Sequence, residues 1–155
     1  MGIIITGSAS GIGLATAHLL HSKGETVTLW DINEADLKST ATLLNADYAV
    51  LDVTDYQQVK DAMADANEKI SEIKAVIHCA GIARVGLFES LPIESHHAMI
   101  SVNLTGTINI AHASIPYLKQ TQGSLVLLAS ASSFYGPPDF AVYGATKGAI
   151  VRFAE

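Results

Sequence analysis

Five short runs of apolar, largely β-branched residues divide the chain, and helix-like periodicity fills the stretches between them. Most of these runs are continuously apolar instead of alternating, which is typical of strands covered on both faces. Strands that alternate with helices need crossover connections and build a parallel sheet with helices on both faces. The sequence therefore predicts an α/β fold, a doubly wound parallel sheet of the Rossmann type, with strands at Ile3–Thr6, Thr26–Asp31, Tyr48–Asp52, Ala75–Cys79 and Ser124–Ser130.

Capping and helix-ending residues mark the limits of the helices between these runs. The first helix is predicted over Gly11–Lys23, with Ile12, Ala15 and Leu19 on one face, and Gly24 supplies the left-handed residue that closes many helices. Asn33 is predicted to cap the second helix. For the third helix, Thr54 with Gln57 matches a capping box, and the predicted buried stripe consists of Val59, Met63, Ala66 and Ile70.

The remaining helices are predicted over 92–119 and from Ala141 onwards. Pro116 is expected to kink the first of these two, because proline removes a helical hydrogen bond and its ring crowds the preceding turn. With these segments every stretch between the strands is assigned.

Composition limits the functions that the chain can serve. With 49% hydrophobic residues, 15% charged residues and a net charge of −6, residues 1–155 are predicted to form one compact domain that does not bind nucleic acid. No apolar run approaches the roughly 18 residues of a membrane span. Cys79 is the only cysteine, which excludes an intrachain disulfide, and we expect a cytoplasmic location. No histidine pair is accompanied by a cysteine or carboxylate at ligand spacing, so no metal site is predicted.

The sequence Thr-Gly-Ser-Ala-Ser-Gly-Ile-Gly follows the first predicted strand and opens the first helix. In a doubly wound sheet such a turn lies where ligands bind, at the carboxyl ends of the strands. Gly7 permits a tight turn, Gly11 allows a pyrophosphate to approach the backbone, and Gly13 allows close packing of helix on strand. Three glycines can also simply shape a loop, so this motif alone is weak evidence for a dinucleotide site.

Asp31 ends the second predicted strand, eighteen residues after Gly13, where the dinucleotide fold places an acid that binds ribose hydroxyls. A capping or solvated aspartate is the alternative reading, although Asn33 is the better cap. The carboxylate would repel a 2′-phosphate about 5 Å away by several kcal/mol at an effective dielectric constant near 20. No lysine or arginine in residues 8–13 or 32–35 offsets that charge, so NAD is predicted over NADP.

Tyr143 and Lys147 are separated by four residues on a predicted helix and leave it on the same face. A tyrosine phenol ordinarily ionises near pH 10, and a nearby ammonium favours the phenolate that a general base needs. Tyr56 and Lys60 share this spacing, but only Tyr143 has a serine thirteen residues upstream, Ser130, at the end of a predicted strand. Its hydroxyl could hold a carbonyl oxygen beside the tyrosine, although the serines around it are equally typical of a turn.

Together these motifs resemble the short-chain dehydrogenase/reductase family, in its single-domain branch, in order over the whole chain. The resemblance implies Tyr143 as general acid/base, Lys147 also on the nicotinamide ribose, Ser130 on the substrate oxygen and Asn103 in a proton relay through water. From the residue alone, Asn103 is as fairly a buried, satisfied amide. The resemblance also assigns the cofactor to Gly7, Ser10, Gly11, Ile12, Gly13, Asp31, Ile32, Asp52, Val53, Cys79, Ala80, Gly81, Tyr143 and Lys147, with Asp52 and Val53 beside the adenine.

The chain departs from the family pattern at two places. Cys79 stands where the family usually has an asparagine, and family members continue beyond the Tyr–Lys helix into further strands and a lid. We therefore expect a fragment of a longer enzyme that is inactive alone. The predicted activity is NAD(H)-dependent interconversion of a secondary alcohol and a ketone. A non-catalytic dinucleotide-binding module is the alternative, and pairing of the last two long helices in a homodimer or homotetramer is compatible with either function.

Overall fold

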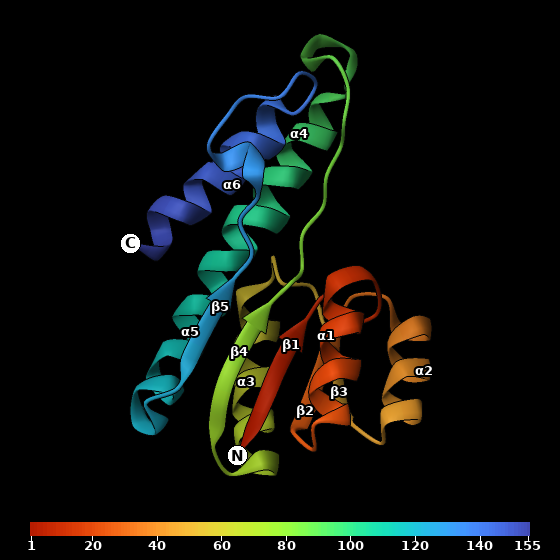
Figure 1. Ribbon diagram of the computed structural model, residues 1–155, viewed down its shortest axis with the longest axis vertical. Coiled ribbons are helices and arrows are strands. Elements are labelled where there is room, and N and C mark those ends of the chain that lie inside the picture. The colour runs from red at the N-terminus through yellow and green to blue at the C-terminus, as the bar shows by residue number, and fades with distance from the viewer.

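A computed structural model describes all residues, 1–155, and contains one five-stranded parallel sheet (Figure 1). The strand order is β3-β2-β1-β4-β5, so the chain reverses direction across the sheet between β1 and β4. The predicted doubly wound sheet is confirmed, with strands β1 (Gly2–Thr6), β2 (Thr26–Asp31), β3 (Asp47–Val50), β4 (Ile73–His78) and β5 (Ser124–Leu127). In parallel sheets of this kind, the crevice at the reversal is the usual ligand site.

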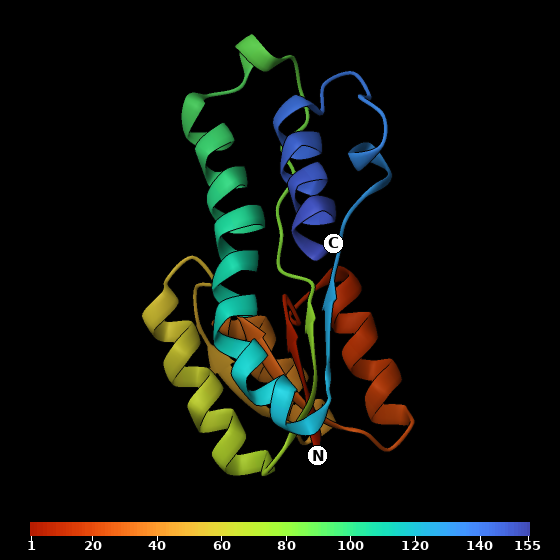
Figure 2. The ribbon, with the colours of Figure 1, turned by 90° about the vertical axis from the view of Figure 1, so that its left-hand side faces the viewer.

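Helices cover both faces of the sheet, as Figures 1 and 2 show. The core on one face joins β1 and β2 to α1 (Gly11–Ser22) and α2 (Glu34–Leu44), through residues such as Ile5, Ala17 and Leu37. The core on the other face joins the sheet to α3 (Tyr56–Ile70) and α5 (Gly106–Thr121), through residues such as Ile4, Met63 and Ile110. Alternate residues of β1 thus enter two different cores, which explains its uninterrupted apolar sequence.

The last elements stand beyond the carboxyl ends of the strands (Figure 1). They comprise α4 (Ile93–Ile100), α6 (Ala141–Ala154) and the short 3₁₀ turns η1 (Phe88–Ser90) and η3 (Ala131–Ser133). Helix α6 packs against α4 and against η3. The sheet edge where ligands are expected therefore has a wall on the α6 side. None of the helices has the length and hydropathy needed to span a bilayer.

The long predicted helix is interrupted, but not at the proline. A five-residue π-helical segment, η2 (Ser101–Thr105), separates α4 from α5, while Pro116 lies inside α5, which continues to Thr121. Segments of π-helix are frequent at functional sites because the wider turn redirects side chains. The residue at the centre of this segment is Asn103.

Helix α1 does not bury the face on which the sequence places Ile12, Ala15 and Leu19. Ile12 and Leu19 are 65% and 55% exposed, whereas Gly13 and Ala17 are buried. The helix turns its small residues toward the sheet because Gly13 lies directly against the backbone of Gly7. Periodicity alone did not reveal that close approach selects small side chains over large ones.

The helix ends give one confirmed cap and one correction. The Asn33 side chain accepts a hydrogen bond from the Asp36 amide and caps α2, and Gly24 has the predicted left-handed backbone with φ of +81°. The cap of α3 is Asp55, not Thr54, and its carboxylate accepts from the amides of the two residues that follow Tyr56. A carboxylate can take both amides at once and is charged, so it is the stronger cap at a helix N-terminus.

Several strand ends were placed too late. β3 ends at Val50, β4 at His78 and β5 at Leu127, so Asp52, Cys79 and Ser130 lie in the loops that follow the strands. Loops at this edge carry most of the predicted site residues, since they are free of the ladder hydrogen bonds.

Candidate active site

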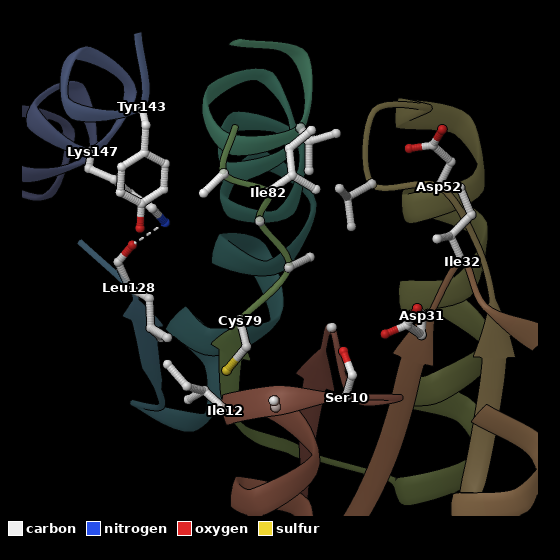
Figure 3. Close-up of a pocket in the computed structure, with 18 of the residues that line it drawn as sticks. Ser10, Ile12, Asp31, Ile32, Asp52, Cys79, Ile82, Leu128, Tyr143 and Lys147 are labelled. Carbon is white, nitrogen blue, oxygen red and sulfur yellow. Dashed lines mark hydrogen bonds between the residues drawn. The ribbon is translucent and has the colours of Figure 1, made fainter. Parts of the chain in front are cut away.

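A pocket of about 510 Å³ opens at the carboxyl ends of the strands (Figure 3). Every residue that the sequence predicted as cofactor-binding lines it: Gly7, Ser10, Gly11, Ile12, Gly13, Asp31, Ile32, Asp52, Val53, Cys79, Ala80, Gly81, Tyr143 and Lys147. The predicted residues Asn103 and Ser130 do not line it. The pocket thus brings together predicted residues from five separate parts of the chain.

The glycine-rich loop is held by contacts that leave no room for side chains. Gly7 has φ of +65°, and a Cβ atom there would lie 2.7 Å from the Ala80 nitrogen. A Cβ atom on Gly13 would lie 2.1 Å from the Gly7 carbonyl oxygen. Real Cβ atoms do not approach other atoms this closely, so both positions require glycine for packing.

Gly11 differs from Gly7 and Gly13 because nothing lies within 4 Å of where its Cβ would be. Its φ of +53° requires a glycine-like backbone, and the open space lies at the start of α1. Ser10, the N-cap of α1, makes no side-chain cap hydrogen bond. Free amides at a helix N-terminus favour an anion, and a pyrophosphate fits both this polarity and the open space.

Asp31 ties the end of β2 to the glycine-rich loop. One carboxylate oxygen accepts from the Ala9 amide at 3.0 Å, and the other accepts from the Asn33 amide at 2.9 Å. Each oxygen has a second lone pair, so the carboxylate can still accept hydrogen bonds from ribose hydroxyls in the pocket. The capping alternative is excluded, since Asn33 caps α2.

The far end of the pocket, beside Asp52 and Val53, is braced from α5. The Asn109 side-chain amide donates to the carbonyl oxygens of Val53 and Thr54, at 3.0 and 3.1 Å. Gly106 gives Val53 the room to pack, since a Cβ there would lie 2.7 Å from a Val53 methyl group. No sequence motif pointed to these two supporting residues, Gly106 and Asn109.

Tyr143 and Lys147 project from α6 into the pocket (Figure 3). The Lys147 ammonium lies 5.9 Å from the centroid of the Tyr143 ring and donates a 2.8 Å hydrogen bond to the Leu128 carbonyl oxygen. Burial lowers the pKa of Lys147, and the nearby Cys79 opposes this shift. Tyr56 and Lys60 lie on α3 outside the pocket, and the Tyr56 ring packs edge-on against His112.

Ser130 does not stand at a strand end as predicted. It caps the short η3 turn, where its hydroxyl oxygen accepts from the Ser132 amide at 3.2 Å and from the Ser132 hydroxyl at 3.0 Å. The turn-forming alternative is thus correct for its local structure. Because the Ser130 oxygen acts as acceptor in both bonds, its own hydrogen remains available to a ligand.

Asn103 is completely buried in the π-helical segment and is fully hydrogen-bonded. Its amide oxygen accepts from the Ile82 amide at 2.8 Å, and its amide nitrogen donates to the Ile82 carbonyl at 2.9 Å and to the Thr146 hydroxyl at 3.1 Å. The reading of Asn103 as a satisfied buried amide therefore matches its side chain.

Two groups near the end of β4 have perturbed protonation. Burial, and secondarily the Lys147 charge, lowers the pKa of His78 to about 4. His78 shares a 2.7 Å hydrogen bond with the Thr6 hydroxyl. Burial raises the pKa of Cys79, with Lys147 opposing, so the thiol in the pocket is neutral at pH 7.

Part of the pocket wall consists of residues that no sequence motif predicted. The missed residues are apolar or small and carry no chemical signal of their own: Leu51, Ile82, Ala83, Val102, Leu128 and Ala129. Their common feature is position, since most lie in or just after the loops that follow a strand at the carboxyl edge. The rule that ligands bind at this edge could have identified them.

The parallel sheet, its reversal at β1 and β4, and the glycine-rich loop at that reversal define a Rossmann-type α/β protein. Residues 2–155 match the short chain dehydrogenase family, and the chain belongs to that family. Its members are oxidoreductases that bind nicotinamide dinucleotides.

Similar proteins include the 3-oxoacyl-[acyl-carrier-protein] reductase FabG of Thermotoga maritima, 36% identical over 98% of this chain and 64% of the relative. The 2-dehydro-3-deoxy-L-rhamnonate dehydrogenase (NAD(+)) of a Sphingomonas strain is 33% identical, over 98% of this chain and 62% of its own. The chain thus spans just under two thirds of the length of these curated relatives.

Solved structures agree with the fold throughout the chain. A 3-ketoacyl-ACP reductase from Sinorhizobium meliloti superimposes with a TM-score of 0.90 at 30% identity, over 99% of this chain and 64% of that one. An alcohol dehydrogenase from Thermococcus sibiricus, complexed with 5-hydroxy-NADP, gives a TM-score of 0.91 at 29% identity, over 97% of this chain and 68% of that one.

Proposed function

We propose that the protein is an NAD(H)-dependent oxidoreductase that interconverts a secondary alcohol and a ketone, with Tyr143 as general acid/base. The observation that carries the proposal is the shared pocket, in which Tyr143 and Lys147 face the same space as the glycine-rich loop and Asp31. A proton donor is useful to hydride transfer only if it lies beside the bound dinucleotide. This pocket meets that requirement.

A nicotinamide held in this pocket would supply the hydride for the carbonyl carbon in the reducing direction and accept it in the oxidising direction. Tyr143 gives its phenolic proton to the carbonyl oxygen, so that the ketone becomes an alcohol and the phenol becomes a phenolate. In the oxidising direction the phenolate takes the alcohol proton as the hydride leaves carbon. The Lys147 ammonium stabilises the phenolate by its charge.

Lys147 is held by the Leu128 carbonyl, which uses one of its three ammonium hydrogens. The remaining two can bind the hydroxyls of the nicotinamide ribose. Ser130 has a free hydroxyl hydrogen that can donate to the substrate oxygen and stabilise the negative charge that develops on it in the transition state. The Asn103 side chain cannot donate a hydrogen bond to a relay water, since both of its amide hydrogens are already donated. A water relay at this residue would therefore have to use groups around the side chain.

NAD is the cofactor that the charges of the pocket favour. Asp31 lies at the end of the pocket where the adenosine ribose belongs, and Lys147 is the only lysine or arginine in the lining. A 2′-phosphate beside this carboxylate would therefore meet uncompensated repulsion. Among the relatives, one name specifies NAD(+) and one structure contains an NADP derivative, so the family accommodates both.

A ketone substrate is supported by the names of the relatives. The 3-oxoacyl and 3-ketoacyl groups named for two of the similar proteins are the same group and contain a ketone, and the protein from Thermococcus sibiricus is named an alcohol dehydrogenase. We therefore take ethyl acetoacetate, a simple 3-oxo ester, as the probe for turnover.

The test is Tyr143→Phe in the full-length protein, with Tyr56→Phe as the matched control on α3. Loss of general acid catalysis should lower kcat with NADH and ethyl acetoacetate by at least about 10²–10⁴-fold, while the Kd for NADH changes less than threefold. The control should keep native turnover. Retained turnover in Tyr143→Phe would refute the mechanism, and NADH binding without turnover in the native protein would favour a non-catalytic module.

A homodimer or homotetramer is the assembly that we propose. Four isoleucines spaced seven or eight residues apart along α4 and α5 are 41–55% exposed, namely Ile93, Ile100, Ile108 and Ile115. Exposed apolar stripes of this kind mark protein interfaces. Light scattering after size exclusion should give a multiple of the monomer mass, and Ile108→Glu should lower it.

A further inference from the structure

Thr146 lies between Tyr143 and Lys147 on α6, but its side chain points away from the pocket lining. It is 3% exposed and does not belong to the lining residues. Its hydroxyl contacts Asn103 on the π-helical segment and the Tyr143 backbone on its own helix. No other side chain of α6 makes a hydrogen bond to that segment.

The direction of these hydrogen bonds is fixed by counting hydrogens. The Tyr143 carbonyl can only accept, so the single Thr146 hydroxyl hydrogen is used in that 2.8 Å bond. The Thr146 oxygen must then accept from the Asn103 amide nitrogen, 3.1 Å away. The hydrogen bonds therefore run in series, from the Asn103 amide to the Thr146 hydroxyl and from that hydroxyl to the Tyr143 carbonyl.

The same count fixes the orientation of Asn103. Its oxygen faces the Ile82 amide, which can only donate, and its nitrogen faces the Ile82 carbonyl, which can only accept. A flipped amide would place donor against donor at Ile82 and would leave Thr146 without a donor. All three groups are satisfied in only one arrangement.

Two walls of the pocket are joined through this arrangement. Ile82 lies on the loop after β4, and Tyr143 and Lys147 lie on α6 (Figure 3). The adjacent Gly81 is close to both, since a Cβ there would lie 3.3 Å from the Asn103 oxygen and 3.6 Å from the Lys147 nitrogen. The Thr146 hydroxyl thus links α6, through Asn103, to the loop that carries Ile82.

We propose that Thr146 is a positioning residue that sets Tyr143 and Lys147 against the Ile82 loop through Asn103. The proposal rests on the proposed function, since it assigns Thr146 to the same reaction. Small displacements of reacting groups slow chemistry far more than they weaken binding. Removal of the hydroxyl should therefore affect kcat more than cofactor affinity.

The experiment compares three variants of the full-length protein with NADH and ethyl acetoacetate. Thr146→Val keeps the shape and removes the hydroxyl, Thr146→Ser keeps the hydroxyl, and Thr40→Val makes the same substitution elsewhere. Thr40 is a buried threonine on α2 whose hydroxyl bonds only the Asp36 carbonyl of its own helix, and it does not line the pocket. It reports what the loss of a buried hydroxyl costs by itself.

Thr146→Val should lower kcat about tenfold and leave the Kd for NADH within twofold. Thr146→Ser should recover most of the rate, and Thr40→Val should keep it. Amide hydrogen exchange at Ile82 should accelerate in Thr146→Val and in neither of the other variants, because one hydrogen of the buried Asn103 amide then has no acceptor while the other still bonds the Ile82 carbonyl.

The inference is overturned if Thr146→Val keeps the native kcat, if Thr146→Ser is impaired as strongly, or if Thr40→Val loses as much. Tyr143→Phe separates it from the proposed function. If that variant is inactive while Thr146→Val is unaffected, only the positioning role fails. If Tyr143→Phe stays active, the mechanism fails, and exchange at Ile82 alone decides whether Thr146 holds the loop.

Discussion

The glycine-rich loop and helix α6 form opposite walls of one pocket, but they are held in place by different means. The loop is fixed by backbone against backbone, with Gly7 and Gly13 in contact where no Cβ fits, and by the Asp31 carboxylate on the Ala9 amide. Helix α6 is tied to its neighbours by individual side chains, the Lys147 ammonium on the Leu128 carbonyl and the Thr146 hydroxyl on Asn103. The first wall is constrained by steric exclusion and the second by single polar bonds.

This difference separates the consequences of mutation. A change in the loop has to move backbone and should cost both stability and binding. A change on α6 removes one polar group and should cost rate while the fold persists. The following variants test this contrast, and they begin where the steric constraint is tightest.

Gly13→Ala should have the largest effect of the stability variants. Its Cβ would overlap the Gly7 carbonyl oxygen, so the loop or α1 must shift, at an expected cost of about 3 kcal/mol or more in the free energy of unfolding. Urea unfolding measures this cost, and NADH titration should show lost affinity. Gly148→Ala on α6 is the matched control, because its Cβ meets only the Ser133 oxygen at 3.9 Å.

In that control the helix should gain stability, by up to about 1 kcal/mol, because alanine is a better helix former than glycine. If Gly13→Ala were tolerated as well as Gly148→Ala, the steric account of the loop would be wrong.

Asp31→Asn should change cofactor preference more than fold. Without the carboxylate charge, the ratio of Kd for NADP to Kd for NAD should fall about tenfold to a hundredfold, less at high salt because screening weakens the repulsion. Titration of both cofactors into the variant measures the ratio. Asp47→Asn, at an exposed aspartate of β3 outside the pocket, is the control and should leave the ratio unchanged. An unaltered ratio in Asp31→Asn would remove the role given to this residue.

His78 makes the stability of the β4 end depend on pH. Its folded pKa of about 4 lies below the value near 6.5 of an unfolded histidine, so the unfolded chain binds the proton first as the pH falls. Stability from the neutral, buried His78 is fully present above pH 6.5 and is lost between pH 6.5 and 4. At about 1.4 kcal/mol for each pKa unit, the loss reaches about 2 kcal/mol at pH 5.

Urea unfolding at pH 7.5 and pH 5 tests this dependence. The difference in the free energy of unfolding between pH 7.5 and pH 5 should shrink by about 2 kcal/mol in His78→Asn. The exposed His18→Asn variant is the control and should behave as the native protein does. An identical pH dependence in His78→Asn and the native protein would contradict the assignment.

The smallest expected effect distinguishes the two candidate caps of α3. Asp55→Ala should lower Tm by about 2–4 °C, because two amides lose their acceptor, and Thr54→Ala should leave it within about one degree. Hydrogen bonds from Gln58 are the main cause of the lowered pKa of Asp55. The cap therefore contributes above the usual aspartate pKa and is lost in stronger acid, where the difference in Tm should vanish. Equal Tm losses in the two variants at neutral pH would restore Thr54 as a cap.

Sequence reasoning recovered the loop wall better than the α6 wall. The alternation of strands and helices, the loop glycines and the placement of Asp31 follow from local patterns, because backbone conformation dictates residue type there. The supporting contacts of α6 join residues that are 19 positions apart, Leu128 and Lys147, and 43 positions apart, Asn103 and Thr146, and no local pattern encodes them. Ser130 shows the same limit, since the serine-rich stretch predicted both a turn and a catalytic hydroxyl, and the structure resolves only the turn.

Exposure was the other source of error. Helical periodicity grouped Ile12 and Leu19 on one apolar face of α1, whereas the packing of Gly13 on Gly7 selects a face of small residues for burial. Ile12 instead lines the pocket. Hydrophobic periodicity identifies that a helix exists more reliably than which side it buries when a close backbone approach intervenes.

The most direct test of the account follows the hydride itself. The full-length protein is incubated with NADH carrying deuterium on the transferring face of C4 and with ethyl acetoacetate, and the alcohol product is examined by mass spectrometry. The account predicts one deuterium on the new carbinol carbon with native protein and almost no product with Tyr143→Phe. An alcohol without deuterium, or product formation that does not depend on Tyr143, would contradict it.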